Sequence, residues 1–149
     1  MRPIILILGP TAGGKTSLSI ELANRLEGGG ECIIADSMQV YKGMDIGTAK
    51  PTQDEQQQAR HHLIDIADPK DDGFTVETWL SRANTVIDDI RARGKWPIVV
   101  GGTNLYVQSL LFGMFDGPEC DQEKRDELNA LPNIELQSRL SVKFIPLFL

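Results

Sequence analysis

The sequence contains little cysteine and little histidine, which limits the cross-links and metal sites that it can form. Its two cysteines are Cys32, in an apolar segment, and Cys120, in a polar one. This usage indicates neither a disulfide framework nor a CxxC metal site, and we expect a cytoplasmic protein. The only histidines are the neighbours His61 and His62. In a strand they would point to opposite faces, and no Cys or Glu lies at ligand spacing, so we expect no metal site there.

Positive charge and long apolar runs are also scarce. A formal net charge of −6 and a pI near 4.9 exclude a general nucleic-acid binder held by bulk phosphate attraction, but leave local recognition open.

The apolar run at residues 4–8 is too short for a signal peptide or a membrane span. Hydrophobic residues make up 41% of the 149 residues, enough for one folded domain rather than a disordered chain. We expect a monomer without membrane association.

Short apolar segments alternate with segments of helical periodicity along the chain. The pattern predicts strands at residues 3–8, 32–35, 62–66 and 97–100. Helices are expected after residue 14, after a cap at Thr52, within residues 74–94, and after a cap at Thr103. Two short polar helices are expected between residues 118 and 140. This alternation predicts an α/β fold with a parallel sheet flanked by helices and ligands at the carboxyl ends of the strands.

A phosphate-binding loop follows the first predicted strand. The segment GPTAGGKT satisfies the pattern GxxxxGK[ST] between a strand and a helix, and consists of Gly9, Pro10, Thr11, Ala12, Gly13, Gly14, Lys15 and Thr16. Its backbone amides can surround a diphosphate, Lys15 adds positive charge, and the Thr16 hydroxyl can bind Mg²⁺. The loop does not identify the substrate, because a nucleotide kinase, an ATPase and an enzyme that expels pyrophosphate could all use it.

A long polar loop follows the second predicted strand, within IIADSMQVYKGMDIGTAKP at residues 33–51. Asp36 is placed to act as a general base, although ordering of the loop or binding of Mg²⁺ are alternative roles. Ser37, Gln39 and Tyr41 could read the edge of a base, or could serve turn formation and packing.

A second glycine turn, Gly101-Gly102-Thr103, follows the last predicted strand. It could bring backbone amides and the Thr103 hydroxyl near a second anion or substrate. The ordinary structural interpretation, a glycine turn with threonine as a helix N-cap, is favoured. The acidic pair at residues 88–89, followed by Arg91 and Arg93, suits a helix end and receives no catalytic role.

Taken together, these segments resemble the N-terminal part of the tRNA dimethylallyltransferase family. The motifs GPTAGGKT, ADSMQVYKGMDIGTAKP, HHLIDI and VVGGTNLYVQSLL occur in the family's order and spacing over residues 1–117. The resemblance implies a P-loop NTPase-like core at residues 1–117, with residues 118–149 beginning an inserted helical region. It also implies transfer of a dimethylallyl group from dimethylallyl diphosphate to the N6 amine of an adenosine beside the anticodon of tRNA, with Mg²⁺.

The resemblance also assigns roles to individual residues. It places the diphosphate on residues 9–16 and makes Asp36 the base at the adenine amine. The tRNA contacts that it implies are Asp36, Ser37, Met38, Gln39, Thr103 and Arg125. The implied catalytic set is Asp36, Lys15, Thr16 and Thr103, with Thr16 as the metal ligand.

The resemblance ends near residue 141, after which VKFIPLFL is unrelated to the family. We therefore expect a truncated chain that binds diphosphate but is weakly active or inactive as a transferase. Two alternatives remain at this point: a P-loop small-molecule kinase, which should prefer ATP, and a non-catalytic nucleotide-binding remnant.

Overall fold

The computed structural model describes residues 1–70, 73–114, 117 and 121–144, so Cys120 and residues 145–149 lie outside the described residues. The chain divides into two compact units, Met1–Met114 and Phe115–Leu149.

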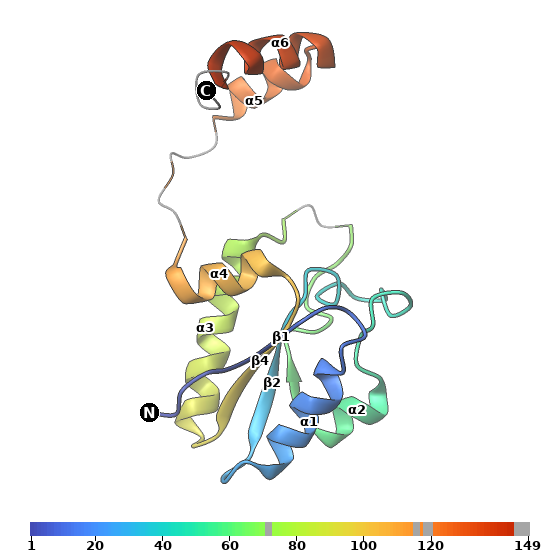
Figure 1. Ribbon diagram of the computed structural model, residues 1–149, viewed down its shortest axis with the longest axis vertical. Helices are drawn as coiled ribbons and strands as arrows, with labels where there is room; N and C mark the ends of the chain where they lie inside the picture. Colours follow the sequence, from blue (N-terminus) through green and yellow to red (C-terminus); the bar gives the residue numbers. More distant parts are fainter. Residues whose placement is uncertain (71–72, 115–116, 118–120, 145–149) are drawn as a thin grey trace. The chain divides into compact units, whose positions relative to one another are not determined.

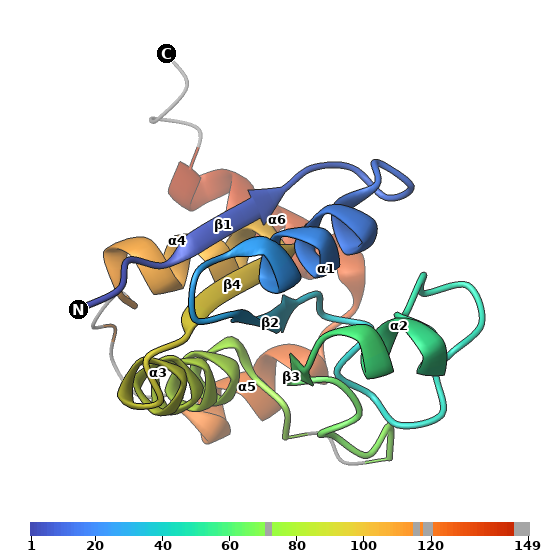
Figure 2. The same cartoon turned by 90° about the horizontal axis from the view of Figure 1, so that it is seen from below.

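Within the described residues, four parallel strands form the sheet of the first unit (Figure 1), and their order is β1-β4-β2-β3 (Figure 2). The strands are β1 (Ile5–Leu8), β2 (Gly30–Ala35), β3 (His61–His62) and β4 (Trp96–Gly101). Gly101 is in register with both Leu8 and Ala35. The carboxyl ends of three strands therefore meet at one edge, where sheets of this class bind ligands.

Helices cover both faces of this sheet (Figure 2). One face carries α1 (Lys15–Arg25) and α2 (Gln53–Gln58), and the other carries α3 (Val76–Ala92) and α4 (Asn104–Phe112). This arrangement confirms the predicted α/β fold with a P-loop-like parallel sheet flanked by helices.

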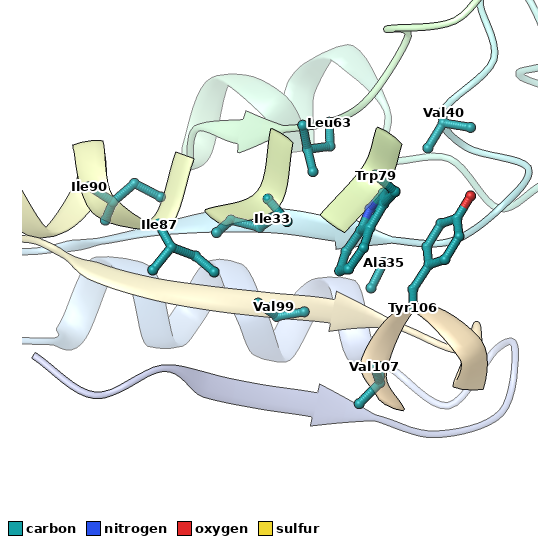
Figure 3. Packing of buried hydrophobic residues seen from close by; sticks show 11 residues of the cluster. Ile33, Ala35, Val40, Leu63, Trp79, Ile87, Ile90, Val99, Tyr106 and Val107 are labelled. Atoms are coloured by element: carbon teal, nitrogen blue, oxygen red, sulfur yellow. The ribbon is translucent and has the colours of Figure 1, made fainter. Parts of the chain in front are cut away.

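The larger hydrophobic core lies between the sheet and the pair α3 and α4 (Figure 3). Trp79 of α3 stacks on Tyr106 of α4, with ring centroids 4.6 Å apart and an interplanar angle of 13°. The Trp79 indole Nε1 also donates a hydrogen bond to the carbonyl oxygen of Ile34 at 2.9 Å. Because a buried indole N–H needs a partner, this bond fixes α3 against the carboxyl end of β2.

The predicted helices are present. Thr52 caps α2 with a capping box, in which its hydroxyl accepts the Glu55 N–H and the Glu55 carboxylate accepts the Thr52 N–H. In the second unit, the two polar helices are α5 (Gln122–Asn129) and α6 (Asn133–Phe144), and Arg139 of α6 lies 3.2 Å from Glu127 of α5. No helix in the described part of the chain is long and apolar enough to cross a membrane.

The strand predicted at residues 62–66 is wrong, because β3 contains only His61–His62. Leu63 and Asp65 have positive φ angles of 60° and 54°, which a strand does not accommodate. Residues 65–67 pair instead with the long polar loop, where the Ile66 N–H donates to the Val40 carbonyl at 2.8 Å. Tyr41 and Ala67 also form a parallel bridge, so this pairing orders the loop along its base.

Candidate active site

The phosphate-binding loop has the backbone shape that its sequence predicts. Gly14, the N-cap of α1, has a φ of 74°, and no side chain caps this helix. The Gly13 N–H donates to the Pro10 carbonyl at 3.2 Å, and Ala12 has a φ of 62°, which is uncommon for a non-glycine residue. The amides at the start of α1 are therefore left for an anionic ligand.

Lys15 folds back over this loop. Its ammonium donates a hydrogen bond to the carbonyl oxygen of Pro10 at 2.7 Å. A carbonyl is a weaker partner for an ammonium than a phosphate oxygen, so an incoming diphosphate can take this bond over.

The ends of β2 and β4 approach each other closely beside the phosphate loop. A Cβ at Gly101 would lie 2.1 Å from the Ala35 carbonyl oxygen, so only glycine fits this position. The Thr103 N–H donates to that same oxygen at 3.1 Å. Thr103 occupies the N-cap position of α4, as predicted, but its side chain makes no capping bond. Its hydroxyl accepts the backbone N–H of Ser37 at 2.9 Å instead.

Asp36 uses one carboxylate oxygen to order the loop that follows it. Its Oδ1 accepts the N–H of Met38 at 2.9 Å and, more weakly, that of Gln39 at 3.4 Å. Within the described residues, no group is hydrogen-bonded to Oδ2. The loop-ordering role that the sequence allowed is therefore present, and it leaves the second oxygen available for a substrate.

A cavity of about 280 Å³ joins the phosphate-binding loop to the long polar loop. Its phosphate end is formed by the loop at residues 11–17, and its other end by segments that follow β2 and by the strand ends themselves. Beyond the phosphate loop the lining residues are Ile34, Asp36, Gln39, Thr48, Ala49, Val100 and Gly101.

The predicted site residues are only partly brought together. Asp36, Gln39 and the loop at residues 11–16 line the cavity, whereas Ser37, Met38 and Thr103 lie outside its lining, as do Gly9 and Pro10. Ser37 and Met38 are exposed. Arg125 lies on α5 in the second unit. Thr48 and Ala49 line the cavity without having been predicted, because no local pattern marks the residues that fold back onto Gln39.

Gln39 is committed to the loop by its amide group. Its Nε2 donates to the carbonyl oxygens of Thr48 at 3.0 Å and Ala49 at 3.1 Å. Both side-chain donors are therefore used within the protein, which leaves Oε1 as the polar atom that could contact a substrate.

The two histidines contact protein groups. His61 Nδ1 lies 2.8 Å from the Ala59 carbonyl oxygen, and burial lowers the pKa of His61. His62 Nε2 lies 2.7 Å from the Glu31 carboxylate. Residues 1–70, 73–114, 117 and 121–144 contain no group of three or more His, Cys, Asp or Glu side chains that could hold a metal ion.

Glu31 is a buried charge at the opposite end of β2, which the sequence did not single out. Its side chain is 1% exposed and pairs with Arg93 and with Lys95, the latter at 2.9 Å. The hydrogen bond from Arg93 holds the pKa of Glu31 far below its usual range. Arg93, predicted only to suit a helix end, therefore neutralises a buried carboxylate.

Comparison with known proteins identifies close relatives. The family model for IPP transferase matches residues 39–143. A tRNA dimethylallyltransferase 2 of Syntrophus aciditrophicus is 53% identical over 122 residues, covering 82% of this chain and 38% of the relative. A tRNA dimethylallyltransferase of Exiguobacterium is 47% identical over 146 residues, covering 97% of this chain and 46% of the relative.

Solved structures give the same result. The full-length tRNA isopentenylpyrophosphate transferase from Bacillus halodurans has a TM-score of 0.73 at 44% identity, covering 98% of this chain and 48% of that one. A eukaryotic dimethylallyltransferase acting on tRNA has a TM-score of 0.77 at 33% identity, covering 95% of this chain and 35% of that one.

This chain spans less than half the length of each of these four relatives. These matches do not favour the small-molecule kinase. With a family model over residues 39–143 and relatives about half identical in sequence, the chain belongs to the IPP transferase family.

Proposed function

We propose that this chain carries the donor and acceptor sites of a tRNA dimethylallyltransferase. The reaction transfers the dimethylallyl group of dimethylallyl diphosphate to the N6 amine of an adenosine beside the anticodon. The observation that supports this proposal best is the single cavity in which the phosphate loop faces Asp36. The relatives named as tRNA dimethylallyltransferases support the same substrates, and we place the reaction in the cytoplasm with a monomeric protein.

The phosphate loop would hold the diphosphate and stabilise it as a leaving group. Breaking the carbon–oxygen bond of the donor leaves an allylic cation and adds negative charge to the pyrophosphate. Backbone amides at the start of α1 and the Lys15 ammonium lie where that charge develops, which is where electrostatic stabilisation accelerates a reaction most. Lys15 would exchange the Pro10 carbonyl for a phosphate oxygen.

Asp36 would act on the acceptor. The lone pair of the N6 amine is delocalised into the adenine ring, so the amine is a poor nucleophile, and a base must accept its proton as the new carbon–nitrogen bond forms. The Oδ2 atom of Asp36 is available for that proton while Oδ1 keeps the loop ordered. The adenine would leave its stack to enter the cavity, which costs less in a loop than in a duplex.

The remaining tRNA contacts would come from residues around the cavity. Ser37 and Met38 are exposed beside it, Gln39 offers its Oε1 atom, and Thr103 contacts the Ser37 backbone. Arg125 of the second unit is proposed as a further tRNA contact.

The cavity fits a magnesium ion bound mainly through the substrate. Mg²⁺ commonly takes one or two protein oxygens, with waters and substrate phosphates as its other ligands. Thr16 offers a hydroxyl as the protein ligand in the cavity lining. When bound, the ion would neutralise charge on the pyrophosphate.

Calorimetry on the purified 149-residue chain tests the donor site. With Mg²⁺ present, we expect dimethylallyl diphosphate to bind more tightly than ATP. Lys15→Met should weaken donor binding by at least about tenfold, because a charge-assisted contact to phosphate is lost. Lys42→Met is the matched control, since Lys42 is an exposed lysine outside the cavity lining. Avid uptake of ATP with no uptake of the isoprenoid donor would contradict the proposal.

A transfer assay tests the acceptor. The chain is incubated with donor, Mg²⁺ and an unmodified tRNA, and the digested nucleosides are analysed by mass spectrometry for N6-dimethylallyl adenosine. Formation of this product would support the transferase function directly, whereas a donor that binds normally but is never transferred would agree with the weak or absent activity expected of the truncated chain.

A further inference from the structure

Lys50, near the end of the long polar loop, carries a charge that is almost completely buried. Its side chain is 3% exposed, although lysine is rarely buried unless its ammonium is paired. Burial by itself would lower the pKa of Lys50, but hydrogen bonds to Asp45 and Asp65 outweigh that effect and raise it. The group therefore stays charged, and its partners must compensate for its lost hydration.

The ammonium is bound by three oxygens from three parts of the chain. Nζ lies 2.7 Å from Asp45 Oδ1, 2.6 Å from Asp65 Oδ1 and 2.9 Å from the Tyr41 carbonyl oxygen. An ammonium has three N–H donors, so all of them are used. Lys50 thus joins the base of the loop, its tip and the segment after β3.

Asp65 connects this ammonium to the cavity. The Asp65 N–H donates to the Gln39 carbonyl at 3.3 Å. The Gln39 side chain in turn holds Ala49, the residue before Lys50, at 3.1 Å. Gln39 also donates its own N–H to Asp36 Oδ1 at 3.4 Å. A continuous set of contacts therefore leads from Lys50 through Asp65 and Gln39 to Asp36.

The backbone next to these contacts is held in an unfavourable conformation. Ala49 and Asp65 have φ angles of 52° and 54°, in the left-handed region that non-glycine residues seldom occupy. Such conformations persist only where the surrounding structure determines them. Lys50 follows the first of these residues in sequence and binds the side chain of the second.

We propose that Lys50 is a positioning residue for the acceptor half of the site: it sets the place of Gln39 and Asp36 in the cavity without touching a substrate. The effect of Lys50 on the acceptor rests on the proposed transferase function. Its effect on the position of the Gln39 side chain does not depend on that function. The phosphate loop is built from a separate segment, residues 9–16, so donor binding should be independent of Lys50.

Lys50→Met tests this inference, because methionine keeps much of the apolar stem and removes the ammonium. Lys42→Met is the matched control in the same loop. The first measurement is the side-chain amide signal of Gln39 in nitrogen-15 NMR spectra of the 149-residue chain, assigned with Gln39→Ala. In Lys50→Met we expect this signal to move to the position of a free glutamine and its exchange with water to accelerate by at least about tenfold. Lys42→Met should leave it unchanged.

The second measurement separates donor from acceptor. Lys50→Met should change the dissociation constant of dimethylallyl diphosphate less than about twofold, and lower kcat/KM for an anticodon stem-loop RNA by up to about 100-fold through misplacement of the base. If Lys50→Met does not fold, Asp45→Asn and Asp65→Asn weaken the same contacts while keeping an oxygen at each position. These variants should show a smaller loss of kcat/KM for the RNA and, again, little change in the dissociation constant of the donor.

The outcomes are distinguishable. An unchanged Gln39 signal, an unchanged kcat/KM for the RNA in a transferring protein, or equal losses of donor and acceptor binding would overturn the role of Lys50. A wild-type chain that takes up ATP and ignores the isoprenoid donor would refute the proposed function. In a wild-type chain that transfers nothing, the Gln39 signal and the donor affinity would still decide the role of Lys50.

Discussion

The hydroxyl of Thr103 accepts the backbone N–H of Ser37 at 2.9 Å, although the two residues are 66 positions apart in the sequence. This bond links the segment after β4 to the first residue beyond Asp36. Thr103 thereby holds the start of the long polar loop, instead of capping its own helix.

Thr103→Ala should therefore loosen the long polar loop and lower the free energy of unfolding by about 1 kcal/mol, the usual net value of one hydrogen bond. Thr103→Ser keeps the hydroxyl and is the matched control. Urea denaturation of the two variants measures the difference. Equal stability of the alanine and serine variants would show that the bond to Ser37 contributes nothing.

Gly101→Ala should disrupt the edge of the sheet that carries the site. The added Cβ would lie 2.1 Å from the Ala35 carbonyl oxygen, which is backbone and cannot rotate away. We expect a loss of about 3 kcal/mol in the free energy of unfolding, together with weaker donor binding.

The neighbouring glycine supplies the control for that substitution. A Cβ at Gly102 would meet the Gly9 carbonyl oxygen at 3.5 Å, an ordinary contact distance. Gly102→Ala should therefore change stability little in the same denaturation experiment. Equal effects at the two positions would contradict the close approach of β2 and β4.

Asp36→Asn should separate the two roles of this carboxylate. The asparagine Oδ1 can still accept the N–H groups of Met38 and Gln39, so the loop and donor binding should be retained. Prenyl transfer should fall by about 100- to 10,000-fold, the usual contribution of a general base.

Single-turnover transfer to tRNA and calorimetry with the donor measure these two effects. Asp68→Asn is the control, because Asp68 makes a similar local bond, to the Lys70 N–H, outside the cavity lining. Unchanged transfer in Asp36→Asn would remove Asp36 from the mechanism.

Glu31→Gln should change how stability depends on pH. The folded pKa of Glu31 lies well below its ordinary value of 4.5. A carboxylate whose folded pKa is depressed contributes stability that is fully present above the unfolded pKa and is lost as pH falls toward the folded pKa. The wild-type chain should thus lose this contribution as pH drops below about 4.5, and Glu31→Gln should lose less over that window.

At neutral pH the same variant should be less stable by about 2–3 kcal/mol, because its partners Arg93 and Lys95 are a third or more exposed and can regain part of their hydration. Denaturation series at several pH values measure both effects, with the exposed Glu27→Gln as control. A pH dependence identical to that of the wild type would refute the buried pairing.

Local sequence signals were sufficient for much of the fold. The glycines and Lys15 of the phosphate loop, the capping residue Thr52 and the apolar periodicity around Trp79 each act over a few residues. Their structures therefore follow from the sequence next to them. The register that aligns Ala35 with Gly101 follows less directly, since it depends on strands far apart in the chain.

Interactions between distant segments account for what the sequence did not reveal. The segment after His62 has the composition of a strand, but its pairing with Val40 and Tyr41 imposes left-handed residues that end the strand. Glu31 interacts with Arg93 over a separation of 62 residues. No short sequence pattern predicts either contact, because each depends on where the fold places a residue that is distant in the sequence.

The indole of Trp79 has a use beyond packing. Its Nε1 is bonded to the Ile34 carbonyl, two residues before Asp36, whereas Trp96 begins β4 at the opposite end of the sheet, where Arg2 lies 4.7 Å from its ring centroid. The two tryptophans thus lie at opposite ends of the sheet, and Trp79 contacts the strand end that lines the cavity. A variant that retains only Trp79 should therefore change its emission when a ligand arrives, without an attached dye.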